Sequence, residues 1–390
     1  NDYNLSLSNE VINKIKSSSS IVDEKSLSNK SIYGINTGFG KLSQIKIKKT
    51  DLETLQKNLL ISHAVGVGPS CPALIVKIMI LLKIISFSKG FSGISIEVVE
   101  FLIKLFNNNY LPFVPTKGSV GASGDLAPLS HLSLPILGLG KILVNGKYIE
   151  SEIALKKIKL NKLKLKPKEG LALINGTQFS TAYGVYCLKK INDFSKVSDV
   201  SAAMSLEAIM GSKKPFLKYV NDLKPYRGQK NVSKNLIDLL ENSEIMDSHI
   251  ECDRVQDIYS LRCIPQVHGS SRDLIKFSND QVNIEVNSVS DNPLVFSDEN
   301  EIISAGHFHA ESVAHALDIA AIALASLSNI SERRVFTLLS GDYNLPKFLI
   351  GNPGLNSGFM MLQVTAAALA SENKILANPS STDSIPTCSN

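Results

Sequence analysis

Three small consecutive residues, Ala122, Ser123 and Gly124, could react with one another along the backbone. If the loop around them is compressed, the amide nitrogen of Gly124 can attack the carbonyl carbon of Ala122. Loss of two water molecules, one of which takes the hydroxyl oxygen of Ser123, would leave an electrophilic methylidene-imidazolone ring. The residue types suit this cyclisation, because Gly124 has no Cβ beside its nitrogen and Ala122 is small enough for a close approach.

The neighbouring residues suit the same chemistry. Gly118 and Gly121 let the backbone adopt strained angles, and Asp125 directly follows the tripeptide and could assist proton transfers. By itself, however, an Ala-Ser-Gly tripeptide is more often an ordinary turn. The tripeptide alone therefore leaves both interpretations open, a turn and a self-made electrophile.

Blocks along nearly the whole chain resemble, in matching order, those of the aromatic amino acid ammonia-lyases. The segment around the tripeptide, residues 118–129, is similar to the loop that forms this family's prosthetic group. The other matching blocks are residues 33–40, 62–66, 169–178, 255–263, 290–293, 308–311 and 363–374. The resemblance implies that Ala122, Ser123 and Gly124 cyclise to 4-methylidene-imidazol-5-one without an external cofactor. It also implies that the chain removes ammonia from an aromatic amino acid.

The resemblance assigns catalytic roles to residues outside the tripeptide. Tyr33 resembles the family's catalytic tyrosine, which lies on a glycine-rich loop that closes over the substrate. Tyr259 resembles a second active-site tyrosine, which a neighbouring subunit supplies in the family. Arg262 resembles the arginine whose planar guanidinium binds the substrate carboxylate.

Three further residues are expected at the substrate by the same resemblance. Asn175 would hydrogen-bond the carboxylate or polarise the prosthetic group, and Gln256 would support the site. Phe308 would pack against the electrophile or the substrate. One departure from the family pattern is Ile258, beside Tyr259, where the family usually has proline.

Two positions indicate which amino acid is bound. His63 and Glu372 match residues of the histidine-specific members of the family, and a carboxylate can pair with an imidazole but not with a phenyl ring. The resemblance therefore implies L-histidine as substrate, with trans-urocanate and ammonia as products. The alternatives are a phenylalanine- or tyrosine-selective lyase or aminomutase of the same family, and a catalytically silent helical oligomer.

The composition argues against other classes of partner. The formal net charge of +5 comes from 41 basic and 36 acidic residues, and no basic stripe interleaved with aromatic residues accompanies it, so we predict no nucleic-acid binding. The most apolar stretch, residues 71–87, is interrupted by Lys77 and Lys83 and is too short to span a membrane, so we expect a buried helix and no membrane contact. A run of lysines is interpreted as a solvated connector: Lys156, Lys157, Lys159, Lys162, Lys164, Lys166 and Lys168.

The cysteines and histidines are not arranged as disulfides or metal sites would require. The five cysteines are scattered and form no CxxC pair, which predicts reduced thiols and a cytoplasmic protein. His307, His309 and Glu311 offer three possible metal ligands, but the start of a helix would point the two histidines to different sides and no further ligand cluster accompanies them. We therefore predict no metal site.

Hydrophobic periodicity predicts a mainly α fold. Helices are expected at residues 51–60, 73–86, 96–105, 178–210, 309–339 and 357–376, with another beginning near residue 126. The Gly- and Pro-containing segments 63–72 and 112–124 are expected to be irregular. Residues 141–149, centred on Asn145 and Gly146, predict a small β-hairpin.

We expect two halves. Residues 1–200 carry the prosthetic-group loop, and residues 201–390 form a central bundle of long helices. The resemblance implies the long helical bundle of the aspartase-like type and a homotetramer whose subunits share active sites. The chain begins with Asn1 and ends soon after Pro386, where family members continue through more helix, so we interpret the sequence as a fragment truncated at its C-terminal end.

Overall fold

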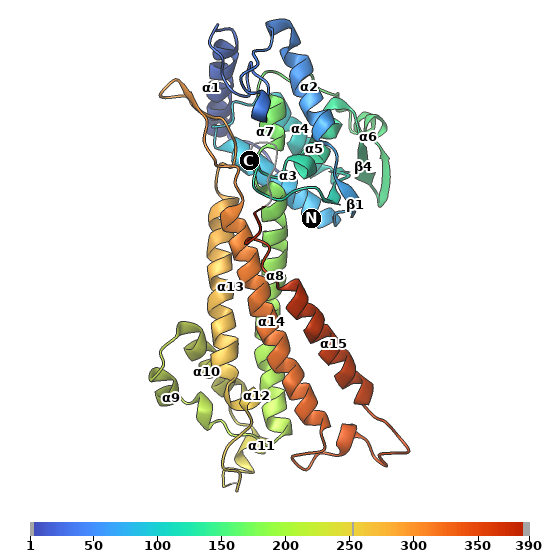
Figure 1. Ribbon diagram of the computed structural model, residues 1–390, viewed down its shortest axis with the longest axis vertical. Helices are drawn as coiled ribbons and strands as arrows, with labels where there is room; N and C mark the ends of the chain where they lie inside the picture. The colour runs from blue at the N-terminus through green and yellow to red at the C-terminus, as the bar shows by residue number, and fades with distance from the viewer. Residues whose placement is uncertain (1–3, 252, 385–390) are drawn as a thin grey trace. The chain divides into compact units, whose positions relative to one another are not determined.

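The computed structural model describes residues 4–251 and 253–384 (Figure 1). Two of the five cysteines, Cys252 and Cys388, lie outside the described residues. The end of the chain, on which the interpretation as a fragment depends, also lies outside them. The chain divides into two compact units, each built from separate stretches of sequence. The first unit comprises Asn1–Tyr186, Val282–Ala314 and Asp383–Asn390; the second comprises Cys187–Gln281 and His315–Thr382.

The first unit is a cluster of helices around one apolar core. Its helices are α1 (Asn9–Ser26), α2 (Leu52–His63), α3 (Ala73–Ser88), α4 (Ile96–Asn107), α5 (Leu126–Ser133), α6 (Ser151–Lys157) and α7 (Glu169–Ile174). Helix α3 is apolar around most of its circumference, and Met79 and Ile80 are fully buried between the other helices. The predicted helices at 51–60, 73–86 and 96–105 are confirmed within three residues.

Short strands surround this helical core. The predicted hairpin is confirmed as β4 (Lys141–Val144) and β5 (Lys147–Glu150), and both turn residues have positive φ angles, 48° at Asn145 and 80° at Gly146, as a tight two-residue turn requires. Strand β2 (Leu111–Pro112) extends this sheet. The prediction of irregular backbone at 63–72 and 112–124 is wrong in part, because β1 (Val67–Ser70) pairs with β3 (Pro115–Lys117). A further hairpin, β6 (Leu294–Phe296) and β7 (Glu301–Ile303), had no predicted counterpart.

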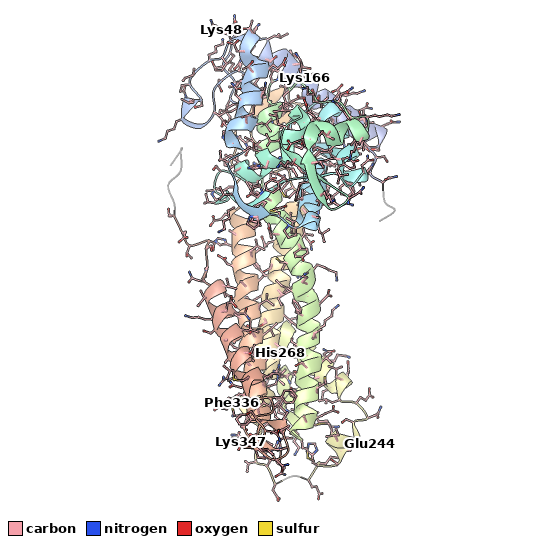
Figure 2. The ribbon with its side chains drawn as sticks, turned by 90° about the vertical axis from the view of Figure 1, so that its right-hand side faces the viewer. Lys48, Lys166, Glu244, His268, Phe336 and Lys347 are labelled. Atoms are coloured by element: carbon pink, nitrogen blue, oxygen red, sulfur yellow. The ribbon has the colours of Figure 1, made fainter. Side chains whose placement is uncertain are left out.

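The lysine run contains one buried member. Lys166, labelled in Figure 2, is exposed, as are the other five lysines before it. Lys168 is fully buried instead, and its Nζ lies 2.8 Å from Oδ2 of Asp291, which is also buried. The interpretation of the whole run as solvated is therefore wrong at Lys168, because a distant carboxylate compensates its charge inside the unit.

Three helices belong to both units. Helices α8 (Gln178–Ala208), α13 (Ile264–Val286) and α14 (Glu311–Leu339) each begin in one unit and end in the other. The second unit adds α9 (Lys218–Asp222), α10 (Arg227–Leu239), α11 (Glu244–Asp247), α12 (Tyr259–Arg262) and α15 (Met360–Leu376). The predicted helices at 178–210, 309–339 and 357–376 are confirmed within three residues at either end.

Within the second unit, the long helices lie side by side (Figure 1). Ser278 of α13 donates a hydrogen bond to the carbonyl of Ala316 on α14 at 2.7 Å. Helix α14 is long and apolar enough to cross a membrane by length and composition, although a core helix of a bundle passes the same test. The chain thus has the predicted mainly α fold, a bundle of long helices with a small β-hairpin.

A buried polar network ties the same helices together. His268 of α13, labelled in Figure 2, lies with Nδ1 2.8 Å from Oδ1 of Asp199 on α8. Nη1 of Arg334 on α14 lies 3.4 Å from the other ring nitrogen of His268. Burial lowers the pKa of His268, while the hydrogen bond to Asp199 opposes this shift.

The buried ion pair of the first unit generates a prediction about stability. Lys168→Met should lower the free energy of unfolding by about 3–5 kcal/mol, because it leaves the carboxylate of Asp291 buried without a counter-ion. The double variant Lys168→Met with Asp291→Asn should be less destabilised than the single one. Urea unfolding measures both. Lys166→Met, at an exposed neighbour, is the matched control, and equal losses for Lys166→Met and Lys168→Met would contradict the prediction.

Candidate active site

A cavity of ≈ 920 Å³ lies within the first unit. Its walls come from the loop after α1, from α2, from the tripeptide loop, from α7 and from the segment before α14. Six of the residues predicted from the sequence line it: Tyr33, His63, Ala122, Ser123, Asn175 and Phe308. The structure therefore brings together residues that are up to 275 positions apart in the chain (308 − 33).

The tripeptide lies in a tight loop that only glycine permits. The φ angles are +76° at Gly121 and +83° at Gly124, and the N–H of Gly124 donates to the carbonyl of Gly121 at 3.2 Å. A Cβ on Gly124 would lie 3.0 Å from the carbonyl oxygen and 3.1 Å from the nitrogen of Gly176. The backbone of Gly176 thus lies close beside Gly124 and leaves no room for a side chain at this position.

Asp125 holds the end of this loop. Its carboxylate is fully buried and accepts hydrogen bonds from the hydroxyls of Ser119 at 2.7 Å and Ser180 at 2.9 Å, and from the N–H of Ser180 at 2.9 Å. Burial raises the pKa of the Asp125 carboxyl, and these hydrogen bonds oppose the shift. The N–H of Asp125 donates to the carbonyl of Gly176 at 2.8 Å, so the loop is joined to the segment that follows α7.

Asn175 presents an unused acceptor to the tripeptide. Its Nδ2 donates to the carbonyl of Asn292 at 3.0 Å, whereas its Oδ1 is buried with no hydrogen-bond partner among the described residues. That Oδ1 lies 3.3 Å from the position a Cβ on Gly124 would occupy. A buried acceptor without a partner is costly, and in a cavity wall it indicates a group to be bound. The surroundings of the tripeptide therefore fit a prosthetic group formed from it.

Two titratable side chains line the cavity from other elements. Nδ1 of His63 lies 2.9 Å from the carbonyl of Leu59, and because a carbonyl only accepts, Nδ1 carries the proton in this hydrogen bond. In the neutral ring, Nε2 is then left as an acceptor. The hydroxyl of Tyr33 accepts from the N–H of Gly40 at 3.4 Å, so the glycine-rich loop positions this phenol.

Five predicted site residues are not among those that line this cavity, and one of them, Gly124, is the last residue of the tripeptide itself. Gln256, Tyr259, Arg262 and Glu372 belong to the second unit. Tyr259 is 73% exposed, and the guanidinium of Arg262 stacks on its ring at 4.5 Å. Nε of Arg262 is buried without a partner among the described residues. Gln256 and Glu372 are exposed.

The predicted absence of a metal site concerned His307, His309 and Glu311. Nδ1 of His309 accepts a hydrogen bond from the N–H of Glu311 at 3.2 Å, and His309 itself lines the cavity. Across residues 4–251 and 253–384, no three His, Cys, Asp or Glu side chains are grouped so as to hold a metal ion.

One residue near the site was missed by the sequence analysis. Lys83 is buried in α3, and its Nζ donates to the carbonyl of Asn175 at 2.6 Å and to Oε1 of Gln178 at 3.2 Å. Burial lowers the pKa of Lys83 from its ordinary 10.5 to about 7. The sequence does show a lysine inside an otherwise apolar helix, a feature that could have indicated a buried functional group. In the sequence analysis it is used only against a membrane span.

The whole chain, residues 1–390, matches the family model of the aromatic amino acid lyases. The chain belongs to this family. Histidine ammonia-lyase from Vibrio cholerae is 49% identical over 99% of this chain and 76% of its own length. Among solved structures, histidine ammonia-lyase from Trypanosoma cruzi has 38% identity and a TM-score of 0.90, covering 98% of this chain and 72% of its own. Phenylalanine aminomutase from Pantoea agglomerans has 31% identity and a TM-score of 0.94, covering 99% and 79%. The family predicted from the sequence is confirmed.

The buried lysine of this aromatic amino acid lyase generates a prediction about pH. The pKa of Lys83 falls from 10.5 to about 7 on folding, so between these pH values the unfolded chain binds more protons than the folded chain. The contribution of Lys83 to the free energy of unfolding therefore increases as pH rises. Lys83→Met lacks that gain. Between about pH 7 and about pH 9.5, urea unfolding should show the free energy of unfolding of the wild type rising relative to that of Lys83→Met by about 1 kcal/mol per pH unit. A difference in the free energy of unfolding, wild type minus Lys83→Met, that stays constant or falls as pH rises would contradict the prediction.

Proposed function

We propose that this chain is a histidine ammonia-lyase, which removes ammonia from L-histidine and leaves trans-urocanate. The observation that carries the proposal is the cavity that places Ala122 and Ser123 together with Tyr33, His63 and Asn175. The names of relatives from Vibrio cholerae and Trypanosoma cruzi support histidine as the substrate. Both relatives are matched over almost the whole of this chain.

In this proposal, Ala122, Ser123 and Gly124 form the methylidene-imidazolone. The group would supply an electrophile that draws electron density from the bound amino acid, so that ammonia can leave. The closure of the Gly176 backbone on Gly124 and the unpartnered Oδ1 of Asn175 support it. The hydrogen bonds from Ser119 to the Asp125 carboxylate and from the N–H of Asp125 to Gly176 hold the loop bent.

Tyr33 is proposed as the base that takes the β-proton of the substrate. Its hydroxyl lies in the cavity wall and is held by the N–H of Gly40, on the same loop. Its ring packs edge to face with Phe39, with the ring centroids 6.4 Å apart. Loop and base would therefore move as one when the cavity closes over the substrate.

His63 supports histidine over phenylalanine or tyrosine. Its Nδ1 proton is used by the carbonyl of Leu59, so Nε2 can accept a hydrogen bond from the N–H of an imidazole. A phenyl ring has no N–H to offer. The structural similarity to phenylalanine aminomutase from Pantoea agglomerans keeps a phenylalanine- or tyrosine-selective enzyme as the second candidate.

The carboxylate of the substrate needs a cationic partner, and its imidazole needs a second partner besides His63. Lys41 is the only lysine or arginine among its described lining residues. The second unit carries the stacked pair of Tyr259 and Arg262, with the Nε of Arg262 unpartnered, together with exposed Gln256 and Glu372. We propose that second units of neighbouring copies complete the site in a homotetramer. Arg262 would bind the carboxylate, and Glu372 would pair with the imidazole.

A cytoplasmic location is part of the proposal. Cys71, Cys187 and Cys263 are free thiols, and this supports a reducing compartment.

Turnover and mass together test the function. The purified chain should release urocanate from L-histidine, followed by its absorbance, and the peptide that contains residues 122–124 should be lighter by two water molecules. Ser123→Ala should lower turnover by about 1000-fold or more, because it removes the hydroxyl that is eliminated. Ser133→Ala, in the helix that follows, is the matched control and should keep full activity. Turnover of phenylalanine or tyrosine alone would favour the second candidate, and an unmodified mass without turnover would favour a silent oligomer.

Mixed oligomers test whether subunits share the site. Ser123→Ala and Arg262→Gln, each inactive alone, should recover activity when co-expressed with different tags and purified through both, because some cavities then combine an intact tripeptide with an intact Arg262. Ser123→Ala mixed with Tyr33→Phe is the control and should recover none, since both residues line the cavity of one chain. Recovery in the control but not in the first mixture would contradict the shared site.

A further inference from the structure

We propose that Lys83 is a positioning residue, which fixes the backbone of Asn175 and so aims the Asn175 side chain at the tripeptide and the cavity. The inference rests on the proposed function, because it concerns the prosthetic group and the substrate that this site would hold.

Lys83 makes its hydrogen bonds to a single short segment. It is 1% exposed in the middle of α3, and its Nζ lies 5.2 Å from the centroid of the Phe87 ring. The two hydrogen-bond acceptors recorded for this Nζ are the carbonyl of Asn175, at 2.6 Å, and Oε1 of Gln178, at 3.2 Å. Asn175 directly follows α7 and Gln178 is the first residue of α8, so both lie where the chain passes from one helix to the next.

The carbonyl of Asn175 needs a donor from outside the helix. Helix α7 ends at Ile174, and Asn175 has extended backbone angles, φ −84° and ψ 135°, so its carbonyl points out of the helical hydrogen-bond pattern. A buried carbonyl without a donor is costly. The Nζ of Lys83 supplies the donor, and its protonated form makes a shorter and stronger hydrogen bond than its neutral form.

With that bond, Asn175 has one polar atom left. Its N–H donates to the carbonyl of Leu171 at 2.9 Å, its Nδ2 donates to Asn292, and its carbonyl accepts from Lys83. Its Oδ1 alone is without a partner among the described residues. Three fixed contacts therefore determine where the fourth group points, and Lys83 provides one of them.

The same segment forms the wall against Gly124. Gly176, next to Asn175, accepts the N–H of Asp125 at 2.8 Å, and Nε2 of Gln178 donates to the hydroxyl of Ser290 at 2.8 Å. A shift of Asn175 would carry Gly176 with it. Lys83 thus acts on both the closure of the loop and the aim of the Asn175 amide.

Burying an ammonium is costly, and that cost lowers the pKa of Lys83. The charges that act on Lys83 are Asp291, which is paired with Lys168, Lys168 itself and Asp125. Among the described residues no carboxylate lies within ion-pair distance of Nζ, so the hydrogen bonds to Asn175 and Gln178 offset only part of the desolvation. A methionine would fill the same volume at less cost, but it could not hold the carbonyl.

Four variants of the full chain test this inference. Lys83→Met removes the donor, Lys83→Gln keeps a neutral donor, and Lys83→Arg keeps a charged one. Lys77→Met is the matched control, because Lys77 lies on the same helix and donates to Asn109 instead. For each folded variant, kcat and KM for L-histidine are measured, and the mass of the peptide with residues 122–124 gives the cyclised fraction.

We expect kcat/KM per cyclised subunit to fall by about 30-fold or more in Lys83→Met, mainly through kcat, because an aimed group acts on the reacting centre. Lys83→Gln should lie between Met and Arg, Lys83→Arg should stay within about fivefold of wild type, and Lys77→Met within about twofold. A merely structural role would reduce the yield of folded protein without this order.

Wild-type kcat/KM per cyclised subunit in Lys83→Met would overturn the inference. If Lys83→Met does not fold, the comparison of Lys83→Gln with Lys83→Arg decides, and equal activity in both would overturn it. A wild-type chain with neither mass loss nor turnover would instead defeat the proposed function. The two failures are therefore distinguishable.

Discussion

The candidate site depends on the contact between the backbones of Gly124 and Gly176. A Cβ on Gly124 would lie 3.0 Å from the carbonyl oxygen of Gly176, so the space between the two backbones is too narrow for a side chain at Gly124. The hydrogen bond from the N–H of Asp125 to that carbonyl fixes the contact. In the proposed cyclisation, the amide of Gly124 must approach the carbonyl carbon of Ala122, and the backbone of Gly176 would be the wall that limits the loop on its outer side. The helices α5, α7 and α8 begin or end within a few residues of this contact, so their packing holds the two segments in place.

Holding this wall requires an unusual number of charges in an apolar unit. Lys83, Asp125, Lys168 and Asp291 are all buried in the first unit. Lys168 and Asp291 compensate each other, whereas Lys83 and Asp125 are satisfied by carbonyl, amide and hydroxyl groups. Such groups weaken the core relative to apolar side chains of similar size, but they fix backbone positions by directed bonds. The first unit therefore has a lower free energy of unfolding than an apolar core would give, and in return the backbone is held in fixed positions where the proposed chemistry takes place.

Local patterns predict the elements well and the buried charges poorly. The apolar period of α3, α8 and α14 and the Asn145-Gly146 turn act over a few residues, so the sequence alone indicates them. The burial of Lys168 depends on Asp291, 123 positions away, and the hydrogen bond of Lys83 reaches Asn175, 92 positions away. The pairing of β1 with β3 is likewise decided by a partner segment and not by propensity. A charge in an apolar stretch was visible in the sequence, but its partner was not.

The candidate site follows the same rule on a larger scale. Tyr33, His63, Asn175 and Phe308 meet at one cavity because a single unit packs the segments that carry them. Arg262 and Tyr259 do not, since they belong to the second unit. A substrate carboxylate would enter a cavity whose described lining holds one lysine, Lys41, while Arg262 stacks on the exposed ring of Tyr259 with its Nε unpartnered. A buried donor without a partner is costly to a folded chain, and Nε of Arg262 is such a donor. The single lysine that lines the cavity and the unpartnered Nε of Arg262 both support the proposal that more than one copy completes the site.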